Sequence, residues 1–162
     1  EPTPSYTNAA MQHGTDTEPQ AAAAYSFYTD AELELVGFVD HPKIDQAGCS
    51  PDRLVYVSGK KGVENGLVEI KCPQTSTHID TLLGGSIPKK YMDQMYWQMA
   101  CTKRQWCDFV SFDPRMPPET QLFIQRVERD EERIKELENM VVEFLFEMNE
   151  KIDRLTKLEN AA

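Results

Sequence analysis

Residues 66–73, Gly66-Leu67-Val68-Glu69-Ile70-Lys71-Cys72-Pro73, are the stretch from which the fold of this chain can be inferred most directly. The apolar residues favour a β-strand, and Pro73 is expected to end it because proline cannot donate a hydrogen bond to a neighbouring strand. Side chains alternate across a strand, so Glu69 and Lys71 should project from one face while Ile70 points into a core on the other. The stretch therefore predicts a strand that carries a carboxylate beside an ammonium group.

A second apolar run, Leu54 to Val57, lies upstream of this strand, and the sequence SGKKG at 58–62 separates the two runs. Two strand-like runs joined by a glycine-containing loop predict an antiparallel β-hairpin. Asp52 precedes the first run, so the hairpin would bring it close to Glu69. Two carboxylates and one ammonium group are thus expected to share one small site.

Outside the hairpin, apolar periodicity and capping residues predict further helices and strands. Thr17 can cap a helix that runs to Tyr28, which places Glu18 in the first turn. Strands are also expected at 33–39, 106–112 and 121–127, a helix from Ser86 to about 102, and a loop at 74–83. This order predicts an α/β fold with a mixed central sheet flanked by helices, as one domain over residues 1–162.

The end of the chain is predicted to form one long amphipathic helix. Asp130 is the expected cap, and Glu131 and Glu132 are well placed for the helix dipole. The apolar residues that follow are spaced by three or four: Ile134, Leu137, Val141, Phe144, Met148, Ile152, Leu155 and Leu158. At 1.5 Å per residue this helix would span about 42 Å, more than one small sheet can cover. Its far end is expected to pack on another subunit, with a kink or a frayed tail as alternatives.

The composition is that of a globular domain. Hydrophobic residues make up 40% of the chain and charged residues 27%, and no apolar run approaches the roughly 20 residues that cross a bilayer. The formal net charge is −10, which argues against a protein that coats nucleic acid without specificity, since such proteins are basic overall. A nuclease is compatible with this charge, because its metals need carboxylates and only its DNA-facing surface has to be positive.

The four cysteines, Cys49, Cys72, Cys101 and Cys107, contain no CxxC pair, which disfavours a zinc site. Their spacing does not favour an iron–sulfur cluster over four reduced thiols. Reduced cysteines without a signal peptide are typical of a cytoplasmic protein.

The grouping of Asp52, Glu69 and Lys71 favours metal-assisted phosphodiester hydrolysis. Carboxylate oxygens are hard ligands that suit Mg²⁺, and a nearby ammonium group can orient the attacking water or stabilise charge that develops on the phosphate. The carbonyl of Ile70 is a further candidate ligand, and Glu18 is a candidate for a second metal ion. A surface hairpin with an ordinary Glu–Lys pair is the alternative, because the E-x-K pattern alone is common.

Pro51-Asp52 followed by Glu69-Ile70-Lys71 resembles the signature of the PD-(D/E)xK nuclease superfamily. More narrowly, the chain is similar to the phage lambda exonuclease family, also known as the YqaJ-like viral recombinases. The segments that carry the resemblance, in the family's order, are MQHG at 11–14 through Glu18, CSPD at 49–52, LVEIKCP at 67–73, LGG at 83–85, YMDQ at 91–94, DPRM at 113–116 and VERDE at 127–131.

This resemblance implies a restriction-endonuclease-like core and Mg²⁺-dependent 5′→3′ digestion of one strand of linear double-stranded DNA, which leaves 3′ overhangs for recombination. Two Mg²⁺ ions are implied, with Mn²⁺ as an alternative. The family also implies a homotrimeric ring, a single-strand annealing protein as partner, no membrane association, and a phage-encoded protein in the cytoplasm of a bacterial host. A helical segment that precedes the family's core and helps to hold the DNA 5′ end is expected to be missing before residue 1.

Carried over by position, the resemblance implies that Asp52 and Glu69 bind metal and that Lys71 activates the water. Glu18 matches the family's helix-borne acid, and Gln94 matches a glutamine expected beside the catalytic lysine. The candidate DNA contacts are Arg53, Lys60, Lys61, Lys89 and Lys90, with a solvated loop lysine as the alternative for each lysine. Trp97 and Trp106 are expected to pack in the core rather than stack on bases.

Two other functions are compatible with these residues. An endonuclease or a repair nuclease could use the same fold, because fold alone does not fix the reaction. In a non-catalytic interaction module, the hairpin would be structural and the long acidic helix would bind a partner protein.

Overall fold

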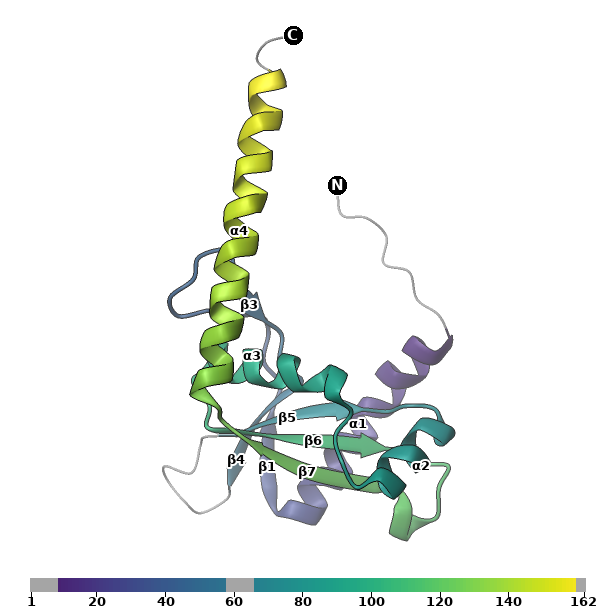
Figure 1. The fold of residues 1–162 in the computed structure, drawn as a ribbon. Helices are drawn as coiled ribbons and strands as arrows, with labels where there is room; N and C mark the ends of the chain where they lie inside the picture. The colour runs from purple at the N-terminus through teal and green to yellow at the C-terminus, as the bar shows by residue number, and fades with distance from the viewer. Residues whose placement is uncertain (1–8, 58–65, 160–162) are drawn as a thin grey trace.

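The computed structural model describes residues 9–57 and 66–159, which form a five-stranded mixed sheet with helices on both faces (Figure 1). The strand order is β1-β4-β5-β6-β7. The strands are β1 Ala31–Glu34, β4 Arg53–Val57, β5 Gly66–Lys71, β6 Trp106–Phe112 and β7 Leu122–Glu128. β5 and β6 run parallel, and the other neighbours in this sheet are antiparallel. The predicted α/β fold with a mixed central sheet is confirmed.

The predicted hairpin is present as β4 and β5, with Arg53 opposite Val68. β5 lies at the centre of the sheet, between β4 and β6. All of its residues from Gly66 to Ile70 are buried. A central strand covered on both faces is expected to be almost continuously apolar, so the buried carboxylate of Glu69 is the exception that needs an explanation.

Two apolar clusters, one on each face of the sheet, form the core. On one face, Ala21 and Tyr25 of α1 (Ala9–Thr29) pack on Val68, Ile70 and Val110. On the other face, residues of α3 (Met92–Thr102) and α4 (Glu131–Glu159) cover the sheet; they include Met95, Met99 and Ile134, packed with Leu67 and Phe109. The alternation of Leu67, Val68 and Ile70 between these clusters follows the period of two that the sequence indicated.

α1 begins at Ala9, eight residues before Thr17, so the prediction that Thr17 caps this helix is wrong. Thr17 is buried, and its hydroxyl lies 3.4 Å from Nδ1 of His13, one turn earlier in the helix. Glu18 and Pro19 therefore lie inside α1 and not in its first turn. Tertiary packing of Ala21 and Tyr25 on the sheet outweighs the cost of an internal proline.

The predicted strand at 33–39 is split between two sheets. β1 ends at Glu34 and pairs with β4, whereas β2 (Val39–Asp40) pairs with β3 (Gly48–Cys49) in a separate two-stranded sheet. His41, which follows β2, is buried against Trp97 of α3, with ring centroids 5.1 Å apart. Trp97 also donates to the carbonyl of Gly48 at 3.0 Å, so it packs in the structure as predicted.

The prediction of a loop at 74–83 is wrong, because Thr75–Gly84 form the helix α2. His78 anchors α2: it is fully buried, with Nδ1 2.7 Å from Ser111 Oγ and Nε2 2.8 Å from the carbonyl oxygen of Thr120. The helix ends at Gly84, and the capping residue Gly85 adopts a left-handed conformation with φ of 57°. The predicted helix from Ser86 instead starts later, as a short 3₁₀ turn, η1 (Lys89–Tyr91), that leads into α3.

α4 follows β7 and projects away from the body of the molecule, as its yellow end in Figure 1 shows. Asp130 caps it as predicted, because its Oδ1 accepts hydrogen bonds from the backbone N–H of Glu132 and Arg133, both at 3.0 Å. Ile134 and Leu137 are buried, whereas residues 151–158 are all exposed. Among the described residues, no helix is apolar and long enough to span a membrane.

Candidate active site at the end of strand β5

Asp52, Glu69 and Lys71 come together at the carboxyl end of β5. Asp52 directly precedes β4, and its Oδ2 accepts a hydrogen bond from the backbone N–H of Ile70 at 2.7 Å. Lys71 forms an ion pair with Oε1 of Glu69, the residue two positions before it on the same face of β5. The hairpin therefore brings together the three side chains that the sequence singled out.

The Glu69 carboxylate is fully buried, and each of its oxygens has a defined partner. Gln94 Nε2 donates to Oε1 at 2.8 Å, so this oxygen is shared by Gln94 and Lys71. Gln98 Nε2 donates to Oε2 at 2.7 Å. A buried carboxylate is tolerated when charge and hydrogen bonds compensate its lost hydration, and here two amides and one ammonium group do so.

Gln98 is a site residue that reasoning from the sequence missed. It lies four residues after Gln94 on α3, and positions i and i+4 share one face of a helix. The prediction for Gln94 rests on its motif. The signal in the sequence for Gln98 is its spacing of four residues from Gln94 on the same helix. A second glutamine at that spacing, between the core residues Met95 and Met99, predicts an amide aimed at the same target.

Burial and mutual repulsion change the charge state of the site. Burial and the neighbouring Glu69 carboxylate raise the pKa of Asp52 to about 7. For Lys71, burial alone would lower the pKa, but Glu69 and Asp52 outweigh this effect and raise it above the ordinary lysine value. This raised pKa keeps Lys71 positively charged at neutral pH, so its ammonium group can donate hydrogen bonds.

Glu18 and Arg53 form an ion pair beside this group. Arg53 Nη1 lies 2.8 Å from Oε1 of Glu18, on α1, and it also donates to the backbone carbonyl of Asp52. Glu18 is close enough to contribute to the raised pKa of Asp52. In the arrangement of the described residues, no three His, Cys, Asp or Glu side chains are grouped tightly enough to hold a metal ion by themselves.

Two of the predicted DNA contacts, Lys89 and Lys90, are exposed on η1. Lys90 Nζ lies 4.8 Å from the ring centroid of Tyr91, and Lys71 Nζ lies 5.1 Å from the same centroid. η1 therefore places the exposed Lys90 near Lys71, with the ring of Tyr91 in contact with both. Lys60 and Lys61 lie outside the described residues.

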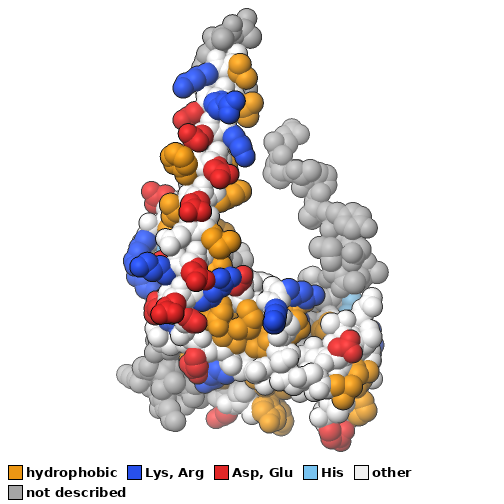
Figure 2. Space-filling model, in the orientation of Figure 1, with side chains coloured by type: hydrophobic (Ala, Val, Ile, Leu, Met, Phe, Trp, Pro, Cys, Tyr) orange, Lys and Arg blue, Asp and Glu red, His pale blue; other side chains and the backbone are white. Residues whose placement is uncertain are grey.

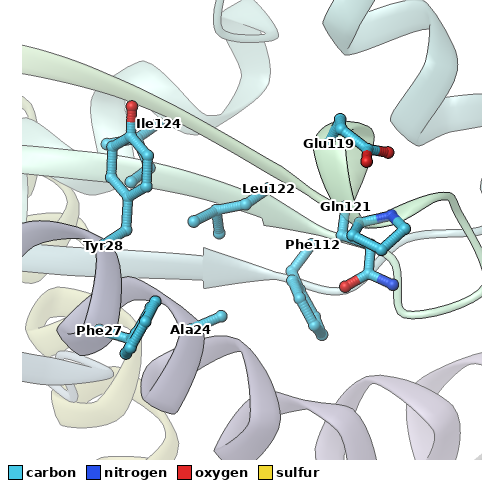
Figure 3. A pocket seen from close by; sticks show the side chains of 9 residues that line it. Ala24, Phe27, Tyr28, Phe112, Glu119, Gln121, Leu122 and Ile124 are labelled. Carbon is cyan, nitrogen blue, oxygen red and sulfur yellow. The ribbon is translucent and has the colours of Figure 1, made fainter.

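A hollow of about 450 Å³ lies elsewhere, on the face of the sheet that α1 covers. Figure 3 shows Ala24, Phe27 and Tyr28 of α1 opposite Leu122 and Ile124 of β7. None of Asp52, Glu69 or Lys71 lines it. This hollow and the chemistry-bearing residues at the end of β5 are thus separate features.

The sequence of residues 1–105 matches the YqaJ-like viral recombinase domain. This chain belongs to the YqaJ-like viral recombinase family. Among curated proteins, none matches the chain significantly. Asp52, Glu69, Lys71 and Gln94 all lie within the matched part of the YqaJ-like domain.

Solved structures resemble the YqaJ-like chain over nearly its whole length. The crystal structure of LHK-Exo, an alkaline exonuclease from Laribacter hongkongensis, is 47% identical with a TM-score of 0.89, and the match covers 97% of this chain and 78% of that one. LHK-Exo in complex with dAMP is 46% identical with a TM-score of 0.90, covering 98% and 78%. A phage-related exonuclease from Haemophilus somnus 129PT shares the fold at 17% identity, with a TM-score of 0.61 and coverage of 90% and 76%.

Proposed function

We propose that this protein is a metal-dependent exonuclease that digests one strand of linear double-stranded DNA from its 5′ end and leaves 3′ overhangs for recombination. The observation that carries the proposal is the position of Asp52, Glu69 and Lys71 at one end of β5. Membership of the YqaJ-like family and 47% identity to an alkaline exonuclease support the same enzyme class.

The oxygen donors at this site fit a divalent metal ion. Asp52 and Glu69 are neighbouring carboxylates whose repulsion helps to raise the pKa of Asp52, and a cation between them would relieve that repulsion. We propose Asp52, Glu69 and the carbonyl oxygen of Ile70 as ligands of Mg²⁺, which commonly takes few carboxylates and keeps several waters. When bound, the ion would neutralise charge on the phosphate and lower the pKa of a water molecule.

Lys71 and Gln94 would act on the reacting groups directly. The Lys71 ammonium can donate a hydrogen bond to the attacking water and stabilise negative charge that develops on the phosphate oxygens. Gln94, which is exposed and contacts the same Glu69 oxygen, can orient the substrate at the open end of the site. In-line attack by water would release a 5′ nucleotide without a covalent enzyme intermediate.

Glu18 is the proposed ligand of a second metal ion. Its Oε1 is paired with Arg53 Nη1, at 2.8 Å, and this oxygen would also become available to the metal if Arg53 turned to another anion. The DNA backbone supplies such an anion, and arginine binds phosphate well. We therefore propose that Arg53 contacts a phosphate near the scissile bond and that Lys60, Lys61, Lys89 and Lys90 contact phosphates farther away. The same metal site would also accept Mn²⁺.

The projecting half of α4 supports a homo-oligomer, which we propose to be a trimeric ring around the DNA. Phe144, Phe146, Leu155 and Leu158 are each more than 60% exposed on this helix, and Figure 2 shows apolar side chains along it. Large apolar side chains that a single chain leaves exposed are typical of a protein interface. We also propose that the enzyme works with a single-strand annealing protein in the cytoplasm of a bacterial host.

Digestion of a 5′-phosphorylated linear duplex in Mg²⁺, beside a Lys71→Ala variant, tests the function and the site together. We expect mononucleotide release that requires Mg²⁺, stops on chelation and falls by at least about 100-fold in the variant. Lys135→Ala, which removes an exposed lysine of α4, serves as a folded control and should retain activity. Absence of release from a folded wild-type chain would contradict the proposal, and cutting of closed circular DNA would favour an endonuclease.

The exposed apolar side chains of α4 are also the observation that favours the second candidate, a non-catalytic interaction module. In that case removal of residues 145–162 would abolish binding of a partner protein, and no metal-dependent cleavage would be found.

A further inference from the structure

Gln98 is a polar side chain in the apolar layer between α3 and the sheet. It is 2% exposed, and its neighbours Met95 and Met99 pack in the cluster that contains Leu67 and Phe109. Burying an amide costs free energy unless its polar atoms find partners. A methionine of similar length would fill the same space without that cost, so packing alone does not account for a glutamine at this position.

The polar contact that Gln98 makes is directed at Glu69. Gln98 Nε2 donates to Glu69 Oε2 at 2.7 Å, while Oε1 of Gln98 has no hydrogen-bond partner within the described part of the chain. The Gln98 side chain therefore donates a hydrogen bond to Glu69 although its own Oε1 has no hydrogen-bond partner among the described residues. Since the Glu69 side chain is 0% exposed, Oε2 cannot exchange this donor for bulk water.

The two oxygens of Glu69 face different surroundings. Oε1 contacts Gln94 and Lys71, and Gln94 is exposed while the Lys71 side chain is 27% exposed, so this oxygen lies toward the open end of the site. Oε2 contacts the buried Gln98 and so lies toward the core. The hydrogen bond from Gln98 thus fixes the inner oxygen, and with it the plane of the carboxylate.

We propose that Gln98 is a positioning residue, which holds the Glu69 carboxylate by its inner oxygen so that the outer oxygen is presented to the metal ion and to Lys71. The proposal rests on the proposed function, in which Glu69 is a metal ligand. Hydrogen bonds to a metal-binding carboxylate orient it, and loss of such a partner typically weakens metal binding or activity by about 10- to 100-fold.

Gln98→Met removes the amide and keeps the length of the side chain, and Met99→Ala is the matched control. Met99 is the next residue on α3, is equally buried, and has no side-chain donor for Glu69. Mn²⁺ binding to the full chain without DNA is measured by electron paramagnetic resonance of the free ion. Two further quantities are measured for each protein: the rate of Mg²⁺-dependent digestion and the affinity for duplex DNA in the presence of chelator.

We expect Gln98→Met to weaken Mn²⁺ binding at least about tenfold and to raise the Mg²⁺ concentration for half-maximal digestion by a similar factor. Duplex affinity in chelator should stay within about twofold of wild type, because a buried side chain is not expected to contact DNA. Met99→Ala should be less stable to heat but bind Mn²⁺ as wild type does, since a cavity in the core does not remove a donor from Glu69. Gln98→Asn, one methylene shorter, should behave like Gln98→Met and replaces it if that variant does not fold.

Wild-type Mn²⁺ affinity in Gln98→Met, or an equal loss in Met99→Ala, would overturn the positioning role and leave the proposed nuclease intact. A wild-type chain that neither binds Mn²⁺ nor cuts DNA would overturn both proposals together.

Discussion

At the scale of single residues, the site depends on two carboxylates: Glu69, which is fully buried and fully paired, and Asp52, which is half-buried and only partly paired. Glu69 has three donors, Lys71, Gln94 and Gln98. Asp52 has the backbone N–H of Ile70, and burial and repulsion raise its pKa to about 7. Without a bound metal ion, the charged Asp52 carboxylate therefore lowers the free energy of unfolding above about pH 7. A metal ion bound to Asp52 would remove this effect.

This difference predicts a pH-dependent stability for Asp52→Asn. An acid whose pKa is raised on folding binds its proton more tightly in the folded state, so folded stability falls as pH rises from about 4 to about 7. Three pKa units correspond to about 4 kcal/mol, and we expect about 2 kcal/mol because the side chain is partly exposed. In chelator, the variant should equal wild type near pH 4 and be the more stable protein at pH 8, as measured by urea unfolding. An advantage for the variant that is the same at both pH values would contradict the assigned cause.

Addition of Mg²⁺ at pH 8 provides the complementary measurement. The ion should stabilise wild type, because it binds only the folded site, and should stabilise Asp52→Asn much less. Equal stabilisation of both proteins would place the metal away from Asp52.

At the scale of elements, α3 connects the core to the site. Its apolar residues Met95 and Met99 fasten it to the sheet, and Gln94 and Gln98 on a neighbouring strip of the same helix reach Glu69. The start of α4 packs in the same cluster through Ile134, and Arg133 of α4 forms a salt bridge with Asp93 of α3, at 2.8 Å. We therefore expect that a stable first turn of α4 helps to keep α3 in place on the sheet.

The contribution of the Asp130 cap to the free energy of unfolding can be measured with two variants. Asp130→Ala removes the acceptor for the N–H groups of Glu132 and Arg133 and should lower the free energy of unfolding by about 1 kcal/mol. Asp130→Asn keeps an acceptor and should change stability by less than about half that amount. Urea unfolding of the three proteins at one pH makes the comparison, and an Asn variant as unstable as Ala would show that charge and not the cap is responsible.

At the scale of the whole molecule, α4 extends beyond the body that supports it, as Figure 1 shows. Phe144, Met148, Ile152 and Leu155 line a hollow on the helix itself, and residues 151–158 are exposed in the single chain. In Figure 2, apolar, acidic and basic side chains alternate along this projecting part. An amphipathic helix of this kind is stabilised mainly by packing of its apolar face on another surface, which here would come from another copy of the chain.

The double variant Phe144→Glu with Leu155→Glu tests this arrangement. Two charges in an apolar contact should dissociate the proposed trimer, so the mass from light scattering at micromolar concentration should fall to that of one chain. Glu150→Lys, an exposed charge on the same helix, should leave the mass unchanged. A monomeric wild-type chain under the same conditions would contradict the oligomer.

Local sequence determined the parts of this protein whose physical causes are local. The apolar residues of 66–71 indicated the strand and the shared face of Glu69 and Lys71. The two neighbouring apolar runs indicated the hairpin that adds Asp52, and Asp130 indicated the start of α4. These features follow from the period of a strand, the reach of a hairpin and the chemistry of a cap.

The tertiary structure alone decided the rest. α2 forms where a loop was predicted because His78 is held between Ser111 and Thr120, which are more than 30 residues away. Glu18 lies inside α1 and pairs with Arg53, and Gln98 reaches Glu69 only because α3 packs across β5. Burial and long-range contacts set these positions, and no window of sequence contains both partners of such a contact.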